Sequence, residues 1–189
     1  MTRSIVIRTL FVMCIAAYPF IILLGLKHLP PSFFGIVLLA VLGLRFGVLM
    51  PEERPVLIPV LLVYVAYAVT ATVSGSQTML LYYPAVVSFT MCGVFLNSLR
   101  QGDSMLLRLM KARKMELDEH APPYLYWLTA IWAGFFVING LVSIWTSTLT
   151  LEVWTLYNGF LSYCLVALLF GVEYVYRGYY RRSKRNETP

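Results

Sequence analysis

The sequence predicts an all-α, polytopic membrane protein with six transmembrane helices. Composition is the first reason: 59% of the 189 residues are hydrophobic and only 13% are charged. Soluble domains usually contain about 45–50% apolar and about 25% charged residues. The second reason is arrangement, because the apolar residues form six stretches near the roughly 20 residues that a helix needs to cross a bilayer. A soluble domain of this length could not bury so much apolar surface, so we expect lipid to be the solvent.

The predicted spans belong to a single membrane domain. In chain order they cover residues 5–26, 32–50, 55–75, 78–98, 124–146 and 153–176. Proline, glycine and charged residues punctuate the breaks, as in KHLPPS, PEERP and SGSQ. The first span resembles a signal peptide, but it is long for one and ends in KHLPP rather than in a small-residue cleavage site, so we expect it to be retained. The second is the weakest because Arg45 interrupts it, although arginine near a helix end can extend to the headgroups.

Basic residues predict the orientation. With a cytoplasmic N-terminus, only Lys27 of the 15 lysines and arginines would lie outside. Cytoplasmic loops of membrane proteins carry the excess of lysine and arginine. We therefore expect a multi-pass protein of the bacterial inner membrane, with both termini and the basic tail 177–189 in the cytoplasm. The net charge of +6 is read as a topology signal and not as a nucleic-acid-binding surface.

The segment 99–123 is predicted to be a basic cytoplasmic loop with an amphipathic helix. On a helical wheel, the apolar arc contains Met105, Leu106, Leu109, Met110 and Leu117, while Leu107 and Arg113 break the pattern. The candidate lipid-surface contacts on the opposite arc are Arg108, Lys111 and Lys114. Two interpretations stay open: a helix lying on anionic lipid, or an ordinary basic inner loop.

Two polar residues are expected to meet inside the membrane. Asn139 lies six residues before Trp145, and Asn158 lies four residues after Trp154, so antiparallel helices would place both at similar depth. Each is followed by a glycine, and small residues let helix backbones approach. One interpretation is a direct amide pair that clamps the helices. The other is a polar pocket to which tyrosines such as Tyr83 contribute.

A carboxylate at membrane depth needs a partner. Glu173 precedes Arg177 by four residues, which places both on one helix face, and Arg45 is a second candidate partner. Ser162 shares the polar edge of this helix with Asn158 and Glu173. A structural ion pair and a proton relay are the two readings of Glu173.

A repeated Tyr-Pro pair suggests internal symmetry in the chain. Tyr18-Pro19 and Tyr83-Pro84 occupy matching positions in the first and fourth spans, which is consistent with a 3+3 inverted repeat.

Nucleotide-binding, zinc-protease and serine-hydrolase motifs are missing from the sequence. The three cysteines fall inside apolar runs with a spacing that suits neither disulfides nor zinc. We therefore expect no catalytic residue, cofactor or metal ligand.

Several motifs also resemble a known family. They are WAGFFVING at 132–140, Trp154, Tyr157-Asn158-Gly159, Ser162-Tyr163, Glu173-Tyr174, Arg177, Tyr83-Pro84 and SLRQGDSMLLRL. This set is similar to a family of bacterial inner-membrane proteins encoded near aryl-polyene gene clusters, which resemble fatty-acid-synthase clusters. Some members carry the label ketosynthase, yet the cysteine nucleophile and histidine partners of a ketosynthase have no counterpart here. A fainter similarity, in length and in the WxxFF…NG segment, is to the intracellular septation protein A family.

These observations and the resemblance lead to a functional expectation. We expect a non-catalytic scaffold or accessory factor in cell-envelope or lipid-conjugate biogenesis. The expected partners are membrane lipids, membrane-bound biosynthetic enzymes and further copies of the chain, with no nucleic acid. The alternatives are a small transporter or flippase for a lipid-linked product and, third, a membrane acyl- or glycosyl-transfer enzyme.

Overall fold

The computed structural model describes residues 13, 17, 19–26, 28–46, 54–112 and 121–187. Side chains are described within these ranges except at 44–46, 54–57, 112 and 180–187. All regular structure in the described ranges is helical, with no strand among them, so the all-α prediction is confirmed.

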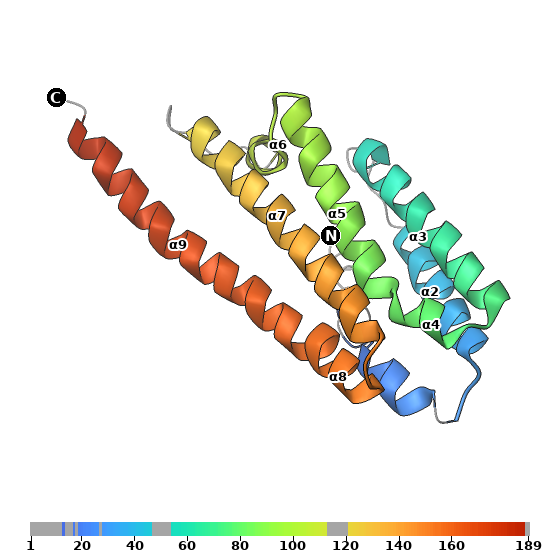
Figure 1. Ribbon diagram of the computed structural model, residues 1–189. Coiled ribbons are helices and arrows are strands. Elements are labelled where there is room, and N and C mark those ends of the chain that lie inside the picture. The colour runs from blue at the N-terminus through green and yellow to red at the C-terminus, as the bar shows by residue number, and fades with distance from the viewer. Residues whose placement is uncertain are drawn as a thin grey trace.

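The helices follow one another with short connections. They are α2 (Pro31–Phe46), α3 (Arg54–Ser74), α4 (Gln77–Leu81), α5 (Tyr83–Arg100), α6 (Met105–Ala112), α7 (Ala121–Ser147), α8 (Leu151–Leu156), the π-helical turn η2 (Tyr157–Leu161) and α9 (Ser162–Glu187). A further helical stretch covers residues 19–25. The longest helices, α3, α5, α7 and α9, run side by side (Figure 1). In the same view α6 is seen nearly along its axis, so it lies across the ends of α5 and α7.

Local sequence explains where the helices begin and end. Pro31 opens α2, where the missing N–H of proline costs nothing. Gly75 and Gly102 follow α3 and α5 with φ angles of 59° and 80°, a left-handed conformation that suits glycine. Thr150 caps α8, because its side chain accepts a hydrogen bond from the Val153 amide at 3.4 Å.

Two of the six predicted spans are long and apolar enough to cross a membrane as they stand. They are Ala121–Ser147 and the continuous stretch Leu151–Tyr179, which match the predictions 124–146 and 153–176. Shorter apolar helices cover Pro31–Gly43 and Ile58–Ser74. The first predicted span, 5–26, lies mostly outside the described residues. The remaining spans therefore stay predictions.

The predicted span 78–98 is helical but interrupted, and its crossing of the membrane stays a prediction. It divides at Tyr82 into the short α4 and the longer α5. Pro84 explains the break, because proline lacks the N–H that would continue the hydrogen-bond ladder and is favoured in the first turn of a new helix. The carbonyl of Leu81, at the end of α4, instead accepts a hydrogen bond from the Trp154 indole Nε1 at 2.9 Å.

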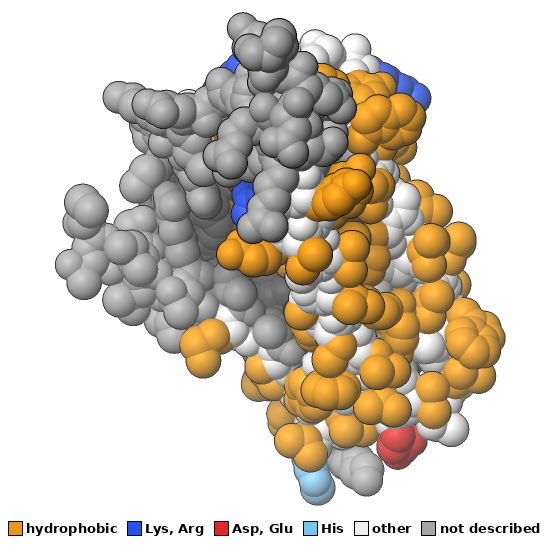
Figure 2. Space-filling model, turned by 90° about the vertical axis from the view of Figure 1, so that its left-hand side faces the viewer, with side chains coloured by type: hydrophobic (Ala, Val, Ile, Leu, Met, Phe, Trp, Pro, Cys, Tyr) orange, Lys and Arg blue, Asp and Glu red, His pale blue; other side chains and the backbone are white. Residues whose placement is uncertain are grey.

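The hydrophobic core lies between α2 and α3 and continues to the end of the bundle where α4 and α8 meet. Trp154 and Leu80 are fully buried there, and Phe34 from α2 is 1% exposed. Away from this core the helices are poorly covered. Only 28% and 22% of the most apolar windows of α7 and α9 are buried. Apolar side chains accordingly cover the middle of the surface in Figure 2, with basic groups in the upper half and acidic and histidine groups at the bottom.

Candidate functional site

A network of polar side chains joins α5, α7 and η2. Asn139 of α7 donates from Nδ2 to Ser88 Oγ of α5 at 2.9 Å. Its Oδ1 accepts from the Tyr157 hydroxyl of η2 at 3.0 Å. One amide thus holds three separate helical elements together, and Ser88 is only 3% exposed.

The second amide, Asn158, makes its own set of bonds. It is 4% exposed, and its Nδ2 lies 3.2 Å from Thr146 Oγ1 and 3.0 Å from the Trp154 carbonyl. Its Oδ1 lies 2.7 Å from Ser143 Oγ. Every hydrogen-bonding atom of this amide therefore has a partner, as a buried polar group requires.

The predicted direct contact between the two asparagines is wrong. Ser143 Oγ lies 2.7 Å from both the Asn139 carbonyl oxygen and Asn158 Oδ1, and no hydrogen bond joins the two amides among the described residues. A serine hydroxyl has a single hydrogen, so these two acceptors share it. The link between them runs instead through Ser143, which lies one turn beyond Asn139 on α7 and which the sequence did not single out.

Glycine allows close packing beside each asparagine, as expected, although against unexpected neighbours. A Cβ atom on Gly140 would lie 2.9 Å from the Phe89 ring of α5. A Cβ atom on Gly159 would lie 2.9 Å from the Phe20 ring. The glycines thus bring α7 and η2 against third elements rather than against each other. Gly159 sits in the π-helical turn, a local widening that is frequent at functional sites.

Two further candidates are buried near this network. Ser162 is 9% exposed and donates to the Asn158 carbonyl at 3.2 Å. Tyr83 opens α5 and is 6% exposed. The polar edge of the last helix therefore does face the bundle, as expected. Tyr18, its counterpart in the suggested repeat, lies outside the described residues.

Glu173 occupies the other end of the α7–α9 pair. Its Oε1 lies 3.5 Å from Arg177 Nε, so the predicted ion pair is confirmed. The same oxygen accepts a hydrogen bond from the Tyr124 hydroxyl of α7 at 3.1 Å. Tyr124 was not among the predicted partners, because it lies 49 residues earlier in the chain. The Arg45 side chain lies outside the described residues.

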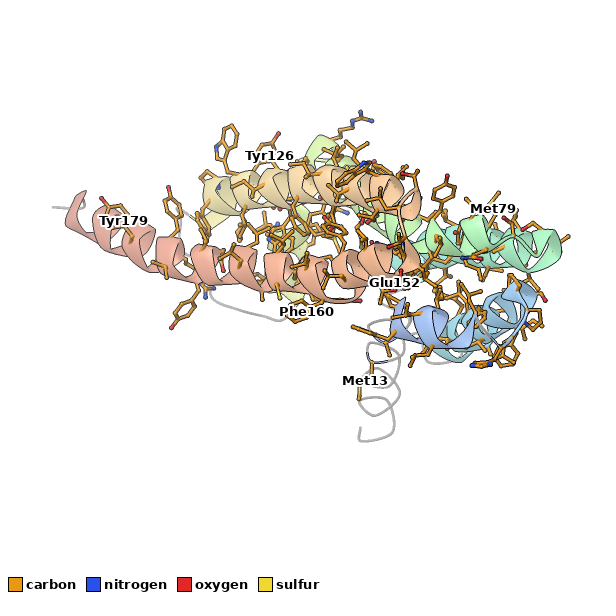
Figure 3. The ribbon with its side chains drawn as sticks, turned by 60° about the horizontal axis from the view of Figure 1, so that its bottom comes forward. Met13, Met79, Tyr126, Glu152, Phe160 and Tyr179 are labelled. Carbon is orange, nitrogen blue, oxygen red and sulfur yellow. The ribbon has the colours of Figure 1, made fainter. Side chains whose placement is uncertain are left out.

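Beside this group a groove of about 670 Å³ opens between α7 and α9. Its lining consists of Pro123, Tyr124, Trp127, Leu128, Ile131, Leu169, Val172, Glu173 and Tyr176. Aromatic rings hold the helices apart here: Tyr124 stacks on Tyr176 with centroids 6.2 Å apart, and Trp132 meets Phe170 at 4.7 Å. In Figure 3, Tyr126 and Phe160 lie on the outer sides of the pair, away from the space between the helices.

The predicted amphipathic helix in the loop exists as α6, but its inward side differs from the prediction. Leu107, which broke the predicted pattern, is only 6% exposed, whereas Leu109 of the predicted apolar arc is 45% exposed. Arg108 donates to Gln101 Oε1 at 2.7 Å, and Lys111 pairs with Asp103 at 2.9 Å. α6 buries the side that meets α7, which the wheel alone could not identify. Lys114 and Leu117 lie outside the described residues.

In the part of the chain that the structure describes, no group of three or more histidine, cysteine, aspartate or glutamate side chains could hold a metal ion. Cys92 and Cys164 are both free thiols. The polar constellations are thus the amide network and the Glu173 group.

Known proteins give no further guidance. Neither protein-family models, nor curated proteins, nor solved structures match the chain. The resemblance stated from the sequence motifs is untested by these comparisons, and the function has to be argued from the molecule itself.

Proposed function

We propose that the chain is a multi-pass inner-membrane protein with six spans and with both termini in the cytoplasm. The low burial of α7 and α9 supports this: a helix that is apolar all round and largely uncovered suits lipid better than water. Charge supports it as well. Arg100, Arg108, Lys111 and Arg177 all belong to the same end of the bundle, where α5 and α9 finish and α6 lies across (Figure 1).

Within the membrane the proposed role is that of a non-catalytic scaffold or accessory factor in envelope or lipid-conjugate biogenesis. The state of the amide network carries this proposal. The side chains of Asn139, Ser143 and Asn158 form hydrogen bonds with groups on α5, α7 and η2, so these bonds join the helices of the bundle. A transport or reaction site needs polar groups that face a substrate. The polar groups of the amide network serve the bundle itself, and the apolar outer surface is left for partners.

Complementation of a strain lacking the gene tests this role. A panel of Asn139→Leu, Asn158→Leu and Glu173→Gln should restore the envelope lipid profile in proportion to the amount of folded protein in the membrane. Lipid analysis measures the restored profile, and quantification of the tagged protein in the membrane measures the amount of folded protein with which it is compared. A variant that folds to the parental level yet restores nothing would overturn the scaffold proposal.

The second candidate function is a small transporter or flippase. Its support is the irregular backbone at Tyr82 and at residues Tyr157–Leu161, because transporters often build substrate sites from broken membrane helices. Purified protein in liposomes separates the two candidates. A flippase would accelerate the inward movement of a fluorescent lipid analogue, and a scaffold would leave that rate at the level of empty liposomes.

A further inference from the structure

The groove between α7 and α9 combines an apolar wall with one charged end. Pro123 and Ile131 mark its extent along α7, and eight residues of helix correspond to about 12 Å. Its volume of about 670 Å³ falls within the range of roughly 300–1,000 Å³ typical of ligand sites. Trp132 and Phe170 meet just beyond Ile131, at the end of the groove nearer the amide network, and Glu173 lies at the other end beside the stacked Tyr124 and Tyr176.

The charged end offers both a donor and an acceptor. Among the described residues, Glu173 bonds only through Oε1, so its Oε2 is without a hydrogen-bond donor. Arg177 faces Glu173 with Nε, which leaves the two terminal guanidinium nitrogens without an acceptor in the same part of the chain. The Glu173 side chain is 13% exposed and that of Arg177 is 38% exposed, so a ligand can reach both. Trp127, 69% exposed, stands at the rim.

We propose that this groove binds a phospholipid with a primary-amine, zwitterionic headgroup of the phosphoethanolamine type. The acyl chain lies along the apolar wall, the ammonium donates to Glu173 Oε2, and the phosphate accepts from the guanidinium of Arg177. This goes beyond the proposed function and shares with it only the membrane location.

Charge complementarity selects this occupant. An adjacent carboxylate and guanidinium form a neutral pair, which matches a headgroup with one positive and one negative charge in the same order. An anionic headgroup without an amine would place its negatively charged phosphate beside the Glu173 carboxylate and would offer that carboxylate no positively charged hydrogen-bond donor. The location agrees, because the pair lies at the end of the bundle where the basic residues gather and where headgroups would be found.

Native mass spectrometry of the full-length protein, extracted from membranes in mild detergent, tests the proposal. The probes are 1-palmitoyl-2-oleoyl lipids with phosphoethanolamine, phosphoglycerol or phosphocholine headgroups, supplied in equal amounts. The parent should retain the phosphoethanolamine lipid about tenfold more than the phosphoglycerol lipid. The reason is that one additional hydrogen bond to a charged group, here from the ammonium to Glu173, raises affinity by about that factor. The phosphocholine lipid has the same charges but no N–H donor, so it should also bind less.

Four variants sharpen the result. Glu173→Gln should bring the ratio between the amine and phosphoglycerol lipids close to one, and Arg177→Gln should weaken both. Ile131→Trp should exclude both lipids by filling the groove. Arg100→Gln is the matched control, because it removes an exposed cation from the end of α5 at the same end of the bundle, and it should leave the ratio unchanged.

Other outcomes would overturn the proposal. Tighter retention of the phosphoglycerol lipid, or an unchanged ratio in folded Glu173→Gln, would remove the role of the charged pair. A lipid-free dimer that Ile131→Trp dissociates would show that a second copy fills the groove. The lipid comparison on the parent protein decides the question even if a variant does not fold. A chain absent from the membrane extract would instead count against the proposed location.

Discussion

The two ends of the α7–α9 pair are built on different principles. At the end near α8, serine, threonine, asparagine and glycine bring the backbones close, and Asn158 is 4% exposed. At the end near the C-terminus, the rings of Tyr124, Tyr176 and Trp127 stand between or beside the helices, and a groove remains. Figure 1 shows the two helices leaving the α8 junction together and reaching the opposite end of the bundle.

The difference shows how one helix pair can combine a closely packed, hydrogen-bonded contact at one end with a groove at the other. Small side chains with interhelical hydrogen bonds permit close contact within a membrane, where lipid gives apolar side chains no reason to prefer protein. Large rings set a wider separation that cannot close without strain. We call the closely packed end near α8 the closed end, and the end near the C-terminus, where the groove remains, the open end.

The largest expected effect is at the closed end. Trp154→Ala should lower the free energy of unfolding by about 3–5 kcal/mol, because the ring is fully buried and its loss also frees the Leu81 carbonyl. Denaturation in mixed detergent micelles measures this. Trp145→Ala is the matched control: that residue is 62% exposed at the same end, and its removal should cost well under 1 kcal/mol. Equal effects of the two changes would contradict the closed-end account.

A smaller effect should appear in the amide network. In a double-mutant cycle, Asn158→Leu and Ser143→Ala should couple by about 0.6 kcal/mol, the average for such bonds in one membrane bundle. Asn158→Leu with Asn139→Leu should couple less, because no bond joins those amides. Ser147→Ala, which removes an exposed hydroxyl from α7, serves as the uncoupled control. Coupling that is strongest between the two asparagines would restore the direct pair.

The smallest effect is predicted at the open end. Tyr124→Phe deletes the hydrogen bond to Glu173, and should cost only about 0.5 kcal/mol because the surroundings are partly open. Tyr126→Phe on the same helix, with a side chain 43% exposed, should cost nothing measurable. The same detergent denaturation compares them. A loss above that of the Asn158→Leu change would show that the two ends do not differ as described.

Much of the architecture follows from local sequence, whereas the contacts do not. Apolar length identified α7 and the α8–α9 stretch, and the spacing of Glu173 and Arg177 identified their ion pair, because both are local features. Ser143 and Tyr124 escaped prediction since their partners come from other helices. A serine in a helix can also satisfy its hydroxyl on the backbone of its own helix, as Ser143 does with the Asn139 carbonyl. Its presence in the sequence therefore does not indicate a partner on another helix.

The inward side of α6 and the break at Tyr82 were missed for related reasons. A helical wheel ranks faces by hydrophobicity, but the face that packs against α7 depends on how the chain enters and leaves the helix. Pro84 could have indicated the break, since proline often opens a helix. The apolar run through residues 78–98 masked that signal.

Topology mapping tests the central claim, a six-span membrane bundle with its basic end in the cytoplasm, most directly. Reporters that are active only in the cytoplasm or only in the periplasm are fused after Ser76, Arg113, Thr148 and Arg185 of the full chain. The account predicts periplasmic activity at Ser76 and Thr148 and cytoplasmic activity at Arg113 and Arg185. A periplasmic signal at Arg185, or the same side for all four positions, would contradict it.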